Sequence, residues 1–174
     1  MISSEEFSLG SAQRAADEGT LAQWVVDFLA SPGSDNAELA AALALSGATY
    51  LGPIPFELER LTPMAGPDEG RVAVPVPREV WELDVEAMEH SFEEGWRPPP
   101  LLVSHRDGKY YLEDGNHRYE ILRRNGATHA WTILLFADEA ERDQYLEGHS
   151  PLRRRPGPDS DAPPGRTGVS ETPS

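Results

Sequence analysis

The sequence is organised around the stretch Glu113-Asp-Gly-Asn-His-Arg-Tyr-Glu-Ile-Leu-Arg-Arg-Asn-Gly126. A strand leads into it, the pair Asp114-Gly115 predicts an abrupt turn, and the residues after the turn predict a helix that stops at Asn125-Gly126. Glycine lets other groups come close to the backbone at this turn, and the first N–H groups of the helix have no partner inside it. A bound phosphate would supply both charge and acceptor oxygens, so the stretch predicts an anion site.

The predicted phosphate contacts are Gly115 and the N–H groups of Asn116, His117 and Arg118. The Arg118 guanidinium can hold phosphate oxygens at two points, and His117 can donate to them and exchange a proton near neutral pH. Asp114 has two roles open to it: it can cap its own helix, or it can bind Mg²⁺ and orient an attacking hydroxyl. A simpler interpretation is an ordinary turn in which Asp114 caps the helix and Arg118 is solvated.

Charge is distributed unevenly along the chain. The net charge is −15, which argues against a nucleic-acid partner, because binding a nucleic-acid backbone relies on Lys and Arg. Residues 97–129 nevertheless hold six Lys or Arg against four Asp or Glu, whereas residues 82–94 hold six acidic residues and no basic one. An anionic ligand would favour this concentration of positive charge around one turn. The attraction of cations to a helix C-terminus accounts equally well for Arg123 and Arg124.

Several function classes are excluded by what the sequence lacks. It contains no cysteine, which removes disulfides, thiolate metal sites and cysteine catalysis. Its five histidines have no metal-ligand spacing, and there is no P-loop, nucleophile elbow or dinucleotide fingerprint. No apolar run approaches the roughly 20 residues of a membrane span, and the acidic start is unlike an export signal. We therefore expect a cytoplasmic protein without a membrane segment.

Hydrophobic periodicity and turn residues predict an α/β (α+β) fold with a small mixed sheet. The expected helices cover residues 20–31, 35–47, 83–95, 116–125 and 138–147, and the expected strands cover residues 52–56, 101–104, 109–113 and 131–136, with a further extended piece at 71–75. Capping boxes are expected at Thr20 with Gln23 and at Asp138 with Glu141. Arg106-Asp107-Gly108 predicts a hairpin turn between the strands at 101–104 and 109–113. The strand at 131–136 is apolar on both faces, as in the middle of a sheet. Trp96 is a candidate wall of a base pocket.

Three regions are expected: an N-terminal helical extension at 1–51, a compact domain at 52–147 and a disordered tail at 148–174 that is rich in proline and arginine. The N-terminal helical pair is interpreted as a cap that packs on the following domain. The alternative is a docking surface for a protein partner or for a second copy of the chain.

The segment from Asp114 to Gly126 resembles the signature of the ParB/sulfiredoxin superfamily, which includes the ParB N-terminal-like nuclease and nucleotide-binding domains. It is most similar to members in which an Asp-Gly-x-His-Arg turn contacts nucleotide phosphates. Residues 54–61, 85–95, 99–103 and 131–136 resemble further elements of that superfamily in the same order, so the resemblance covers about residues 52–147. It implies a compact domain of this type that binds ATP or CTP, together with Mg²⁺ held by Asp114.

The resemblance also bears on catalysis. Sulfiredoxin needs a catalytic cysteine about where Asn116 stands, so that activity is excluded. Kinases of free serine share the fold and an Asp-Gly-His-His-Arg turn, and their Asp and an upstream Glu are thought to serve catalysis; here those roles would fall to Asp114 and Glu69, with His117 as a proton-exchanging group. Chromosome segregation is disfavoured, because no helix-turn-helix follows residue 147.

Two functions remain open at this stage. The first is an enzyme at the turn of residues 114–118, either a Mg²⁺-dependent NTPase or a small-molecule kinase. The second is a non-catalytic module that senses a nucleotide or interacts with a protein through the N-terminal helices.

Overall fold

The computed structural model describes residues 6–149. Within this range the helices are α1 (Leu9–Asp17), α2 (Leu21–Ala30), α3 (Ala37–Leu45), α4 (Arg78–Glu93), α5 (Asn116–Arg124) and α6 (Glu139–Gly148), with a short 3₁₀ helix at Leu58–Arg60. The strands are β1 (Thr49–Glu57), β2 (Leu61–Pro63), β3 (Ala65–Gly66), β4 (Val74–Pro75), β5 (Leu101–Arg106), β6 (Lys109–Asp114) and β7 (His129–Phe136).

A five-stranded mixed sheet forms the centre of the molecule, in the order β1-β7-β5-β6-β2. Strand β7 pairs antiparallel with β1 and parallel with β5, and β6 pairs antiparallel with β5 and parallel with β2. The predicted mixed sheet is thus confirmed, as is the central place of the strand at 131–136. Strand β1 lies at an edge, where its prolines cost no ladder hydrogen bond. The predicted hairpin between β5 and β6 turns at Asp107 and Gly108, both with positive φ.

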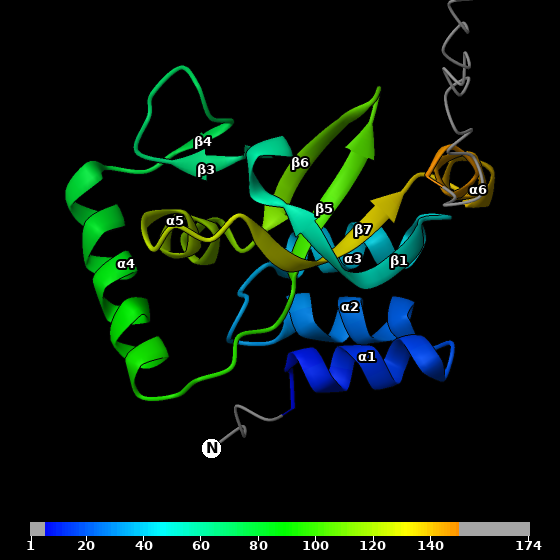
Figure 1. Cartoon of the computed structure of the whole chain (residues 1–174), viewed down its shortest axis with the longest axis horizontal. Helices are drawn as coiled ribbons and strands as arrows, with labels where there is room; N and C mark the ends of the chain where they lie inside the picture. The colour runs from blue at the N-terminus through cyan, green and yellow to red at the C-terminus, as the bar shows by residue number, and fades with distance from the viewer. Residues whose placement is uncertain (1–5, 150–174) are drawn as a thin grey trace, which may run out of the picture.

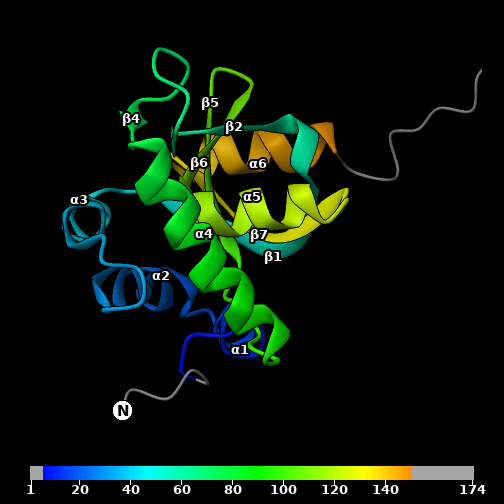
Figure 2. The same cartoon turned by 90° about the vertical axis from the view of Figure 1, so that its left-hand side faces the viewer.

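Helices cover both faces of the sheet, as Figures 1 and 2 show. On one face Leu102 and Ile133 pack with the apolar side chains of α1, α2 and α3. On the other face Leu101 and Leu134 belong to a second cluster, to which α5 and α6 contribute. Helix α4 lies outside α5, against which it packs Trp81. Neighbouring residues of β5 thus point to opposite faces, because side chains alternate along a strand. The sheet is buried on both sides.

Two helices begin earlier than the sequence indicated. Helix α1 is complete, because Ser8 and Ser11 form a capping box whose two small side chains are easily overlooked. Helix α4 starts at Arg78 rather than near residue 83, directly after Pro77 at its N-cap. The capping box expected at Thr20 is wrong, since the Thr20 hydroxyl donates to the Ala15 carbonyl instead. Of the capping box expected at Asp138, the side chain of Asp138 does accept from the Glu141 N–H, but the Glu141 side chain accepts from the Ala137 N–H instead of closing the box.

The N-terminal helices lie against the sheet, as expected of a cap, while the domain boundaries at 51 and 147 stay a prediction. From residue 150 onward the tail lies outside the described residues. None of the helices between residues 6 and 149 has the length and apolar character needed to cross a membrane.

Candidate functional site

The predicted turn connects the end of β6 to the start of α5. Gly115 is the N-cap of α5 with φ of 100°, a left-handed conformation that other residues rarely adopt. A Cβ at this position would lie 2.6 Å from Leu101 Cδ2 and 2.7 Å from Arg118 Nη2, so only glycine fits. No side chain caps this helix, and the first backbone bond is from the Tyr119 N–H to the Gly115 carbonyl. The interpretation of Asp114 as the helix cap is therefore wrong.

Asp114 instead joins two parts of the chain. Its Oδ2 accepts a hydrogen bond from Arg118 Nη2 at 2.8 Å, and its Oδ1 accepts one from the Ser34 hydroxyl at 2.7 Å. Ser34 belongs to the connection between α2 and α3, so the carboxylate links the turn to the N-terminal helices.

Arg118 is 5% exposed, which rules out the interpretation of a solvated first-turn residue. Its Cζ lies 5.7 Å from the centre of the Phe28 ring, within the range of a cation–π contact. Burial lowers the pKa of Arg118, and the charge and hydrogen bond of Asp114 oppose this effect. The guanidinium remains charged. Only its Nη2 bonds to Asp114, which leaves donors for another acceptor.

A hollow of about 510 Å³ lies over this turn. Its polar lining includes residues 114–118, among them Arg118. Its apolar side includes Phe28, Met88 and Trp96, so the prediction that Trp96 lines a pocket here is in agreement with its position. The connection between α2 and α3 completes the wall through residues 31–34. The hollow thus exists only where the N-terminal helices meet the turn.

Asn116 has a structural role in the turn. Its Oδ1 accepts hydrogen bonds from the N–H groups of Met64 and Ala65, at 3.0 and 3.1 Å, and its Nδ2 donates to the Leu112 carbonyl at 3.3 Å. Its side chain thus fixes the segment between β2 and β3 to the end of β6. The backbone N–H of Asn116 is the part that remains for a ligand.

His117 is wedged between α4 and the hollow. Its ring stacks on Trp81 with the centroids 4.2 Å apart and the planes inclined by 27°. Nε2 is buried without a hydrogen-bond partner among the described residues and lies 3.7 Å from Asp84 Oδ2. Burial lowers the pKa of His117 below its usual 6.5, Asp84 acts in the opposite direction, and Arg118 adds to the lowering. The ring is therefore neutral at neutral pH.

The other predicted site residues are less well placed. Glu69 lies in the loop between β3 and β4 and is not among the residues around the hollow, so its catalytic role stays a prediction. Among residues 6–149 no cluster of three metal-ligating side chains exists. Each oxygen of Asp114 accepts one hydrogen bond and keeps a lone pair, so Asp114 can offer one ligand to Mg²⁺ and its metal role stays a prediction. A Mg²⁺ ion would have to take most of its ligands from phosphates and water.

Sequence reasoning missed three residues of the site. Trp81 could have been found, because Trp81, Val85, Met88 and Phe92 follow the 4-3-4 spacing of one helical face. Phe28 was identified as apolar, but nothing in its spacing points to Arg118. Ser34 gives no signal at all, since it lies 80 positions from the carboxylate that it contacts.

Comparison with solved structures finds proteins similar to parts of this chain. A free serine kinase in complex with AMP matches at 22% identity with a TM-score of 0.34, over 47% of this chain and 30% of that chain. Sulfiredoxin from Arabidopsis thaliana matches at 18% identity with a TM-score of 0.35, over 56% and 97% of the two chains. ParB from Caulobacter crescentus, complexed with CTP-gamma-S, matches at 19% identity with a TM-score of 0.30, over 60% and 53%.

No protein-family model matches the sequence, and a search of curated proteins gives no match either. The chain spans about a third of the free serine kinase and about half of the ParB chain, so what it resembles is one part of those proteins. At these identities and TM-scores the likeness is one of fold, and the proposals below rest on the residues of this chain. The similar structures are a free serine kinase, a sulfiredoxin and a ParB protein, which are the kinds of protein that the turn motif resembles.

Proposed function

We propose that the protein binds the phosphates of a nucleoside triphosphate, ATP or CTP, at the turn of residues 114–118. The observation that carries this proposal is the hollow lined by residues 114–118 and by apolar side chains, at the start of a helix that no side chain caps. The N–H groups and the guanidinium suit phosphate oxygens. Trp96 offers aromatic surface on which a base can stack, whereas Phe28 is buried against Trp24 and Arg118.

The charges around the turn shape how such a ligand would bind. Asp114 neutralises Arg118, and His117 is neutral, so the turn itself offers little net positive charge to a triphosphate. We therefore propose that Mg²⁺ arrives with the nucleotide, coordinated by phosphate oxygens and water, with Asp114 as its one protein ligand. Each oxygen of Asp114 keeps a lone pair for the ion beside the hydrogen bond that it accepts from Ser34 or Arg118.

An enzyme at this site would transfer or hydrolyse the terminal phosphate. Asp114 and His117 border the hollow and are the proposed catalytic residues, with Glu69 as a further acid if its loop approaches the nucleotide. The AMP and CTP-gamma-S in two of the similar structures agree with a nucleotide ligand without deciding the question.

A specific contact favours the alternative of a non-catalytic nucleotide sensor. A phosphate that competes with Asp114 for Arg118 would weaken the hold of Asp114 on Ser34. The ligand would then change how the N-terminal helices sit on the sheet, and with it a surface that a protein partner can recognise. In this mode nucleotide binding would proceed without turnover.

The test is a thermal-shift panel of ATP, CTP, other nucleotides and inorganic phosphate, each with and without Mg²⁺. A ligand at 100 times its dissociation constant stabilises the folded state by about 2.7 kcal/mol, which gives a rise in Tm of several degrees. Arg118→Lys should reduce that rise, because lysine lacks the two-point donor geometry, whereas Arg123→Lys should not. If no nucleotide raises Tm, the proposal is wrong. Release or transfer of phosphate then separates the enzyme from the sensor.

A further inference from the structure

Asp84 approaches His117 from a different helix. Asp84 is exposed on α4, and its Oδ2 is the carboxylate oxygen nearest to His117 Nε2, at 3.7 Å. Trp81, one turn earlier on the same helix, holds the flat face of the ring. Stacking fixes the plane of the ring, and Asp84 lies on the side of Nε2. Together they set the orientation of the imidazole.

The two ring nitrogens of His117 differ in their surroundings. Nε2 is shut off from solvent, although the side chain as a whole is 33% exposed, so the exposure belongs to the rest of the ring. Among the described residues 6–149, Nε2 is the buried side-chain nitrogen or oxygen without a partner, and Nδ1 does not share that situation. A proton on Nε2, directed at the Asp84 carboxylate, leaves Nδ1 as the nitrogen with a free lone pair.

His117 also lies where two hollows meet. The hollow over the turn and a second one of about 760 Å³ share Met88, Trp96 and His117. The second hollow runs along α4 past Asp84 and Ser91. A phosphate at the turn and an acceptor molecule in the second hollow would therefore have His117 between them.

We propose that Asp84 is a positioning residue, which holds His117 with Nε2 toward α4 so that Nδ1 takes the proton of a hydroxyl acceptor in the second hollow. This inference rests on the proposed function in its enzymatic form. The acceptor oxygen forms a bond to the terminal phosphorus of the nucleotide, and the bond from that phosphorus to the bridging oxygen breaks. The bond electrons leave with the nucleoside diphosphate, and the acceptor proton moves to Nδ1 of His117. With water as the acceptor, the same step is hydrolysis.

The charged groups around His117 define what should be measured. Asp84 on α4 and Asp114 at the end of β6 favour the protonated ring, while Arg118 on α5 opposes it. Asp84→Asn removes one of these influences without changing the size of the side chain. Glu86→Gln is the matched control, because Glu86 is exposed on the same helix and lies in neither hollow.

The first experiment follows the imidazole of His117 by NMR in the full chain without nucleotide. We expect ¹⁵N shifts typical of the Nε2–H tautomer, and a further fall in the pKa of His117 in Asp84→Asn but not in Glu86→Gln. An equal titration of His117 in the wild type and Asp84→Asn would overturn the proposal.

The second experiment measures phosphate transfer or release with the same variants. Asp84→Asn should lower kcat about tenfold or more and leave KM for the nucleotide unchanged, since general base catalysis contributes roughly 10²- to 10⁴-fold. Asp84→Glu should restore part of the rate. Unchanged kcat in Asp84→Asn would overturn the catalytic part of the proposal. Absence of turnover in the wild type, with the NMR effect intact, would count against the enzymatic form of the proposed function and not against the positioning of the ring.

Discussion

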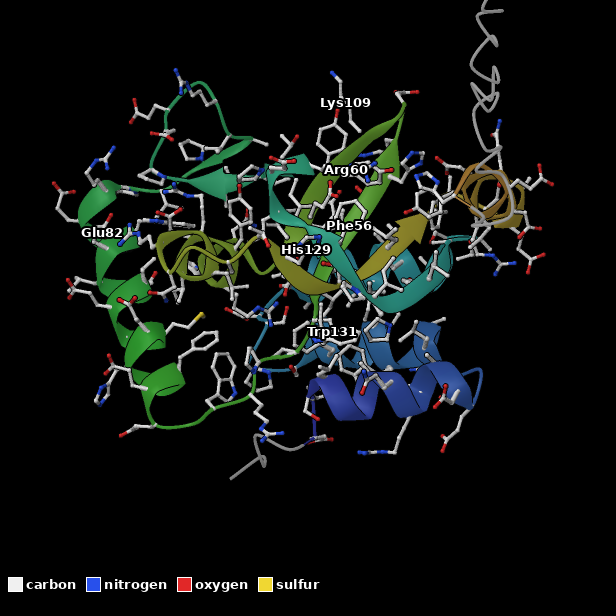
Figure 3. All side chains as sticks on the ribbon, in the orientation of Figure 1. Phe56, Arg60, Glu82, Lys109, His129 and Trp131 are labelled. Atoms are coloured by element: carbon white, nitrogen blue, oxygen red, sulfur yellow. The ribbon has the colours of Figure 1, made fainter. Side chains whose placement is uncertain are left out.

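The two ends of α5 carry arginines in opposite situations. At the N-terminal end Arg118 is buried and bonds to one carboxylate, that of Asp114. At the C-terminal end Arg123 and Arg124 are more exposed and share the carboxylate of Glu120. Arg124 also forms two hydrogen bonds to Glu82 on α4, which Figure 3 shows beside the helix.

The arginines at the two ends of α5 are held by residues at different distances along the chain. The C-terminal pairs involve neighbours three and four positions away on one helix, and hydrogen bonds raise the pKa of Arg124 above its usual value. The N-terminal pair depends on Ser34 and Phe28, which come from a different part of the chain. The first arrangement needs no ligand to explain it. The second places a charge beside a hollow, where a ligand can reach it.

The largest difference between the two ends is expected for removal of an arginine. Arg118→Met leaves the largely covered Asp114, whose side chain is 12% exposed, without its cation, which should lower the free energy of unfolding by about 3 kcal/mol. Arg123→Met removes an exposed pair and should cost about 0–1 kcal/mol. Urea unfolding of both variants measures the difference. Equal losses would show that the buried pair is no more important to the fold than the exposed one.

Each end also has a glycine with positive φ. Gly115→Ala adds a Cβ that overlaps Leu101 and Arg118, so the expected loss of stability is about 2–4 kcal/mol. Gly126→Ala, with open space around its Cβ, should cost only the conformational penalty of about 1–2 kcal/mol. Denaturant unfolding again provides the readout. A loss at Gly115 no larger than at Gly126 would contradict the close packing of the turn.

The hydrogen bond from Ser34 to Asp114 is expected to contribute less to the free energy of unfolding than the two features above. Ser34→Ala removes a hydrogen bond to a carboxylate and should cost about 1–2 kcal/mol. Ser46→Ala removes an exposed hydrogen bond within the end of α3 and should be close to neutral. If nucleotide binding competes with the Ser34 bond, Ser34→Ala should also strengthen that binding, as isothermal titration can show. Weaker binding would oppose the sensor mode.

The two ends should also respond to acid in different pH ranges. Because burial lowers the pKa of His117, the unfolded chain binds a proton near pH 6.5 that the folded chain does not, and stability falls as the pH drops below that value. At the other end, the hydrogen bond from Arg124 lowers the pKa of Glu82 from its usual 4.5. The stability that ionised Glu82 contributes is therefore present above pH 4.5 and is lost as the pH falls below it.

His117→Phe tests this separation, since an aromatic ring can keep the contact with Trp81. The free energy of unfolding of this variant is measured between about pH 8 and pH 4. Its decline near about pH 6, which His117 causes in the wild type, should disappear, and the decline below about pH 4.5 should remain. An unchanged profile would mean that His117 does not titrate differently in the folded and unfolded chain.

Local patterns explain which features could be predicted. The hairpin at Asp107 and Gly108 and the apolar strand at 131–136 depend on residues close together in sequence, and both were predicted. The close approach of other groups to the backbone at Gly115 was also predicted, because it depends on the local pair Asp114-Gly115. The surplus of Lys and Arg in residues 97–129 was a less reliable sign of an anionic ligand. Four of these arginines have carboxylate partners within the protein: Arg106, Arg118, Arg123 and Arg124. A count of charges does not show which of them are already paired.

The remaining features depend on distant contacts. Asp114 was expected to cap a helix or bind a metal, and the structure gives it two partners, one of them 80 residues away. The contact of the Asn116 backbone N–H with phosphate stays a prediction, whereas the hydrogen bonds of its side chain to the Met64 and Ala65 amides could not be foreseen. Arg60 lies over the ring of nearby Phe56 (Figure 3). It also lies over the ring of Tyr110, which is 50 positions away and which no local pattern connects to it.

The shared packing of Leu102 and Ile133 with the first three helices has a practical consequence for dissecting this protein. A truncated version beginning at residue 52 would expose this apolar face of the sheet to water, and it would lack both Phe28 and Ser34. Such a fragment would be prone to aggregate, and a negative ligand assay on it would say nothing about the intact chain. The minimal unit for crystallisation trials or screening therefore includes the helices ahead of the sheet.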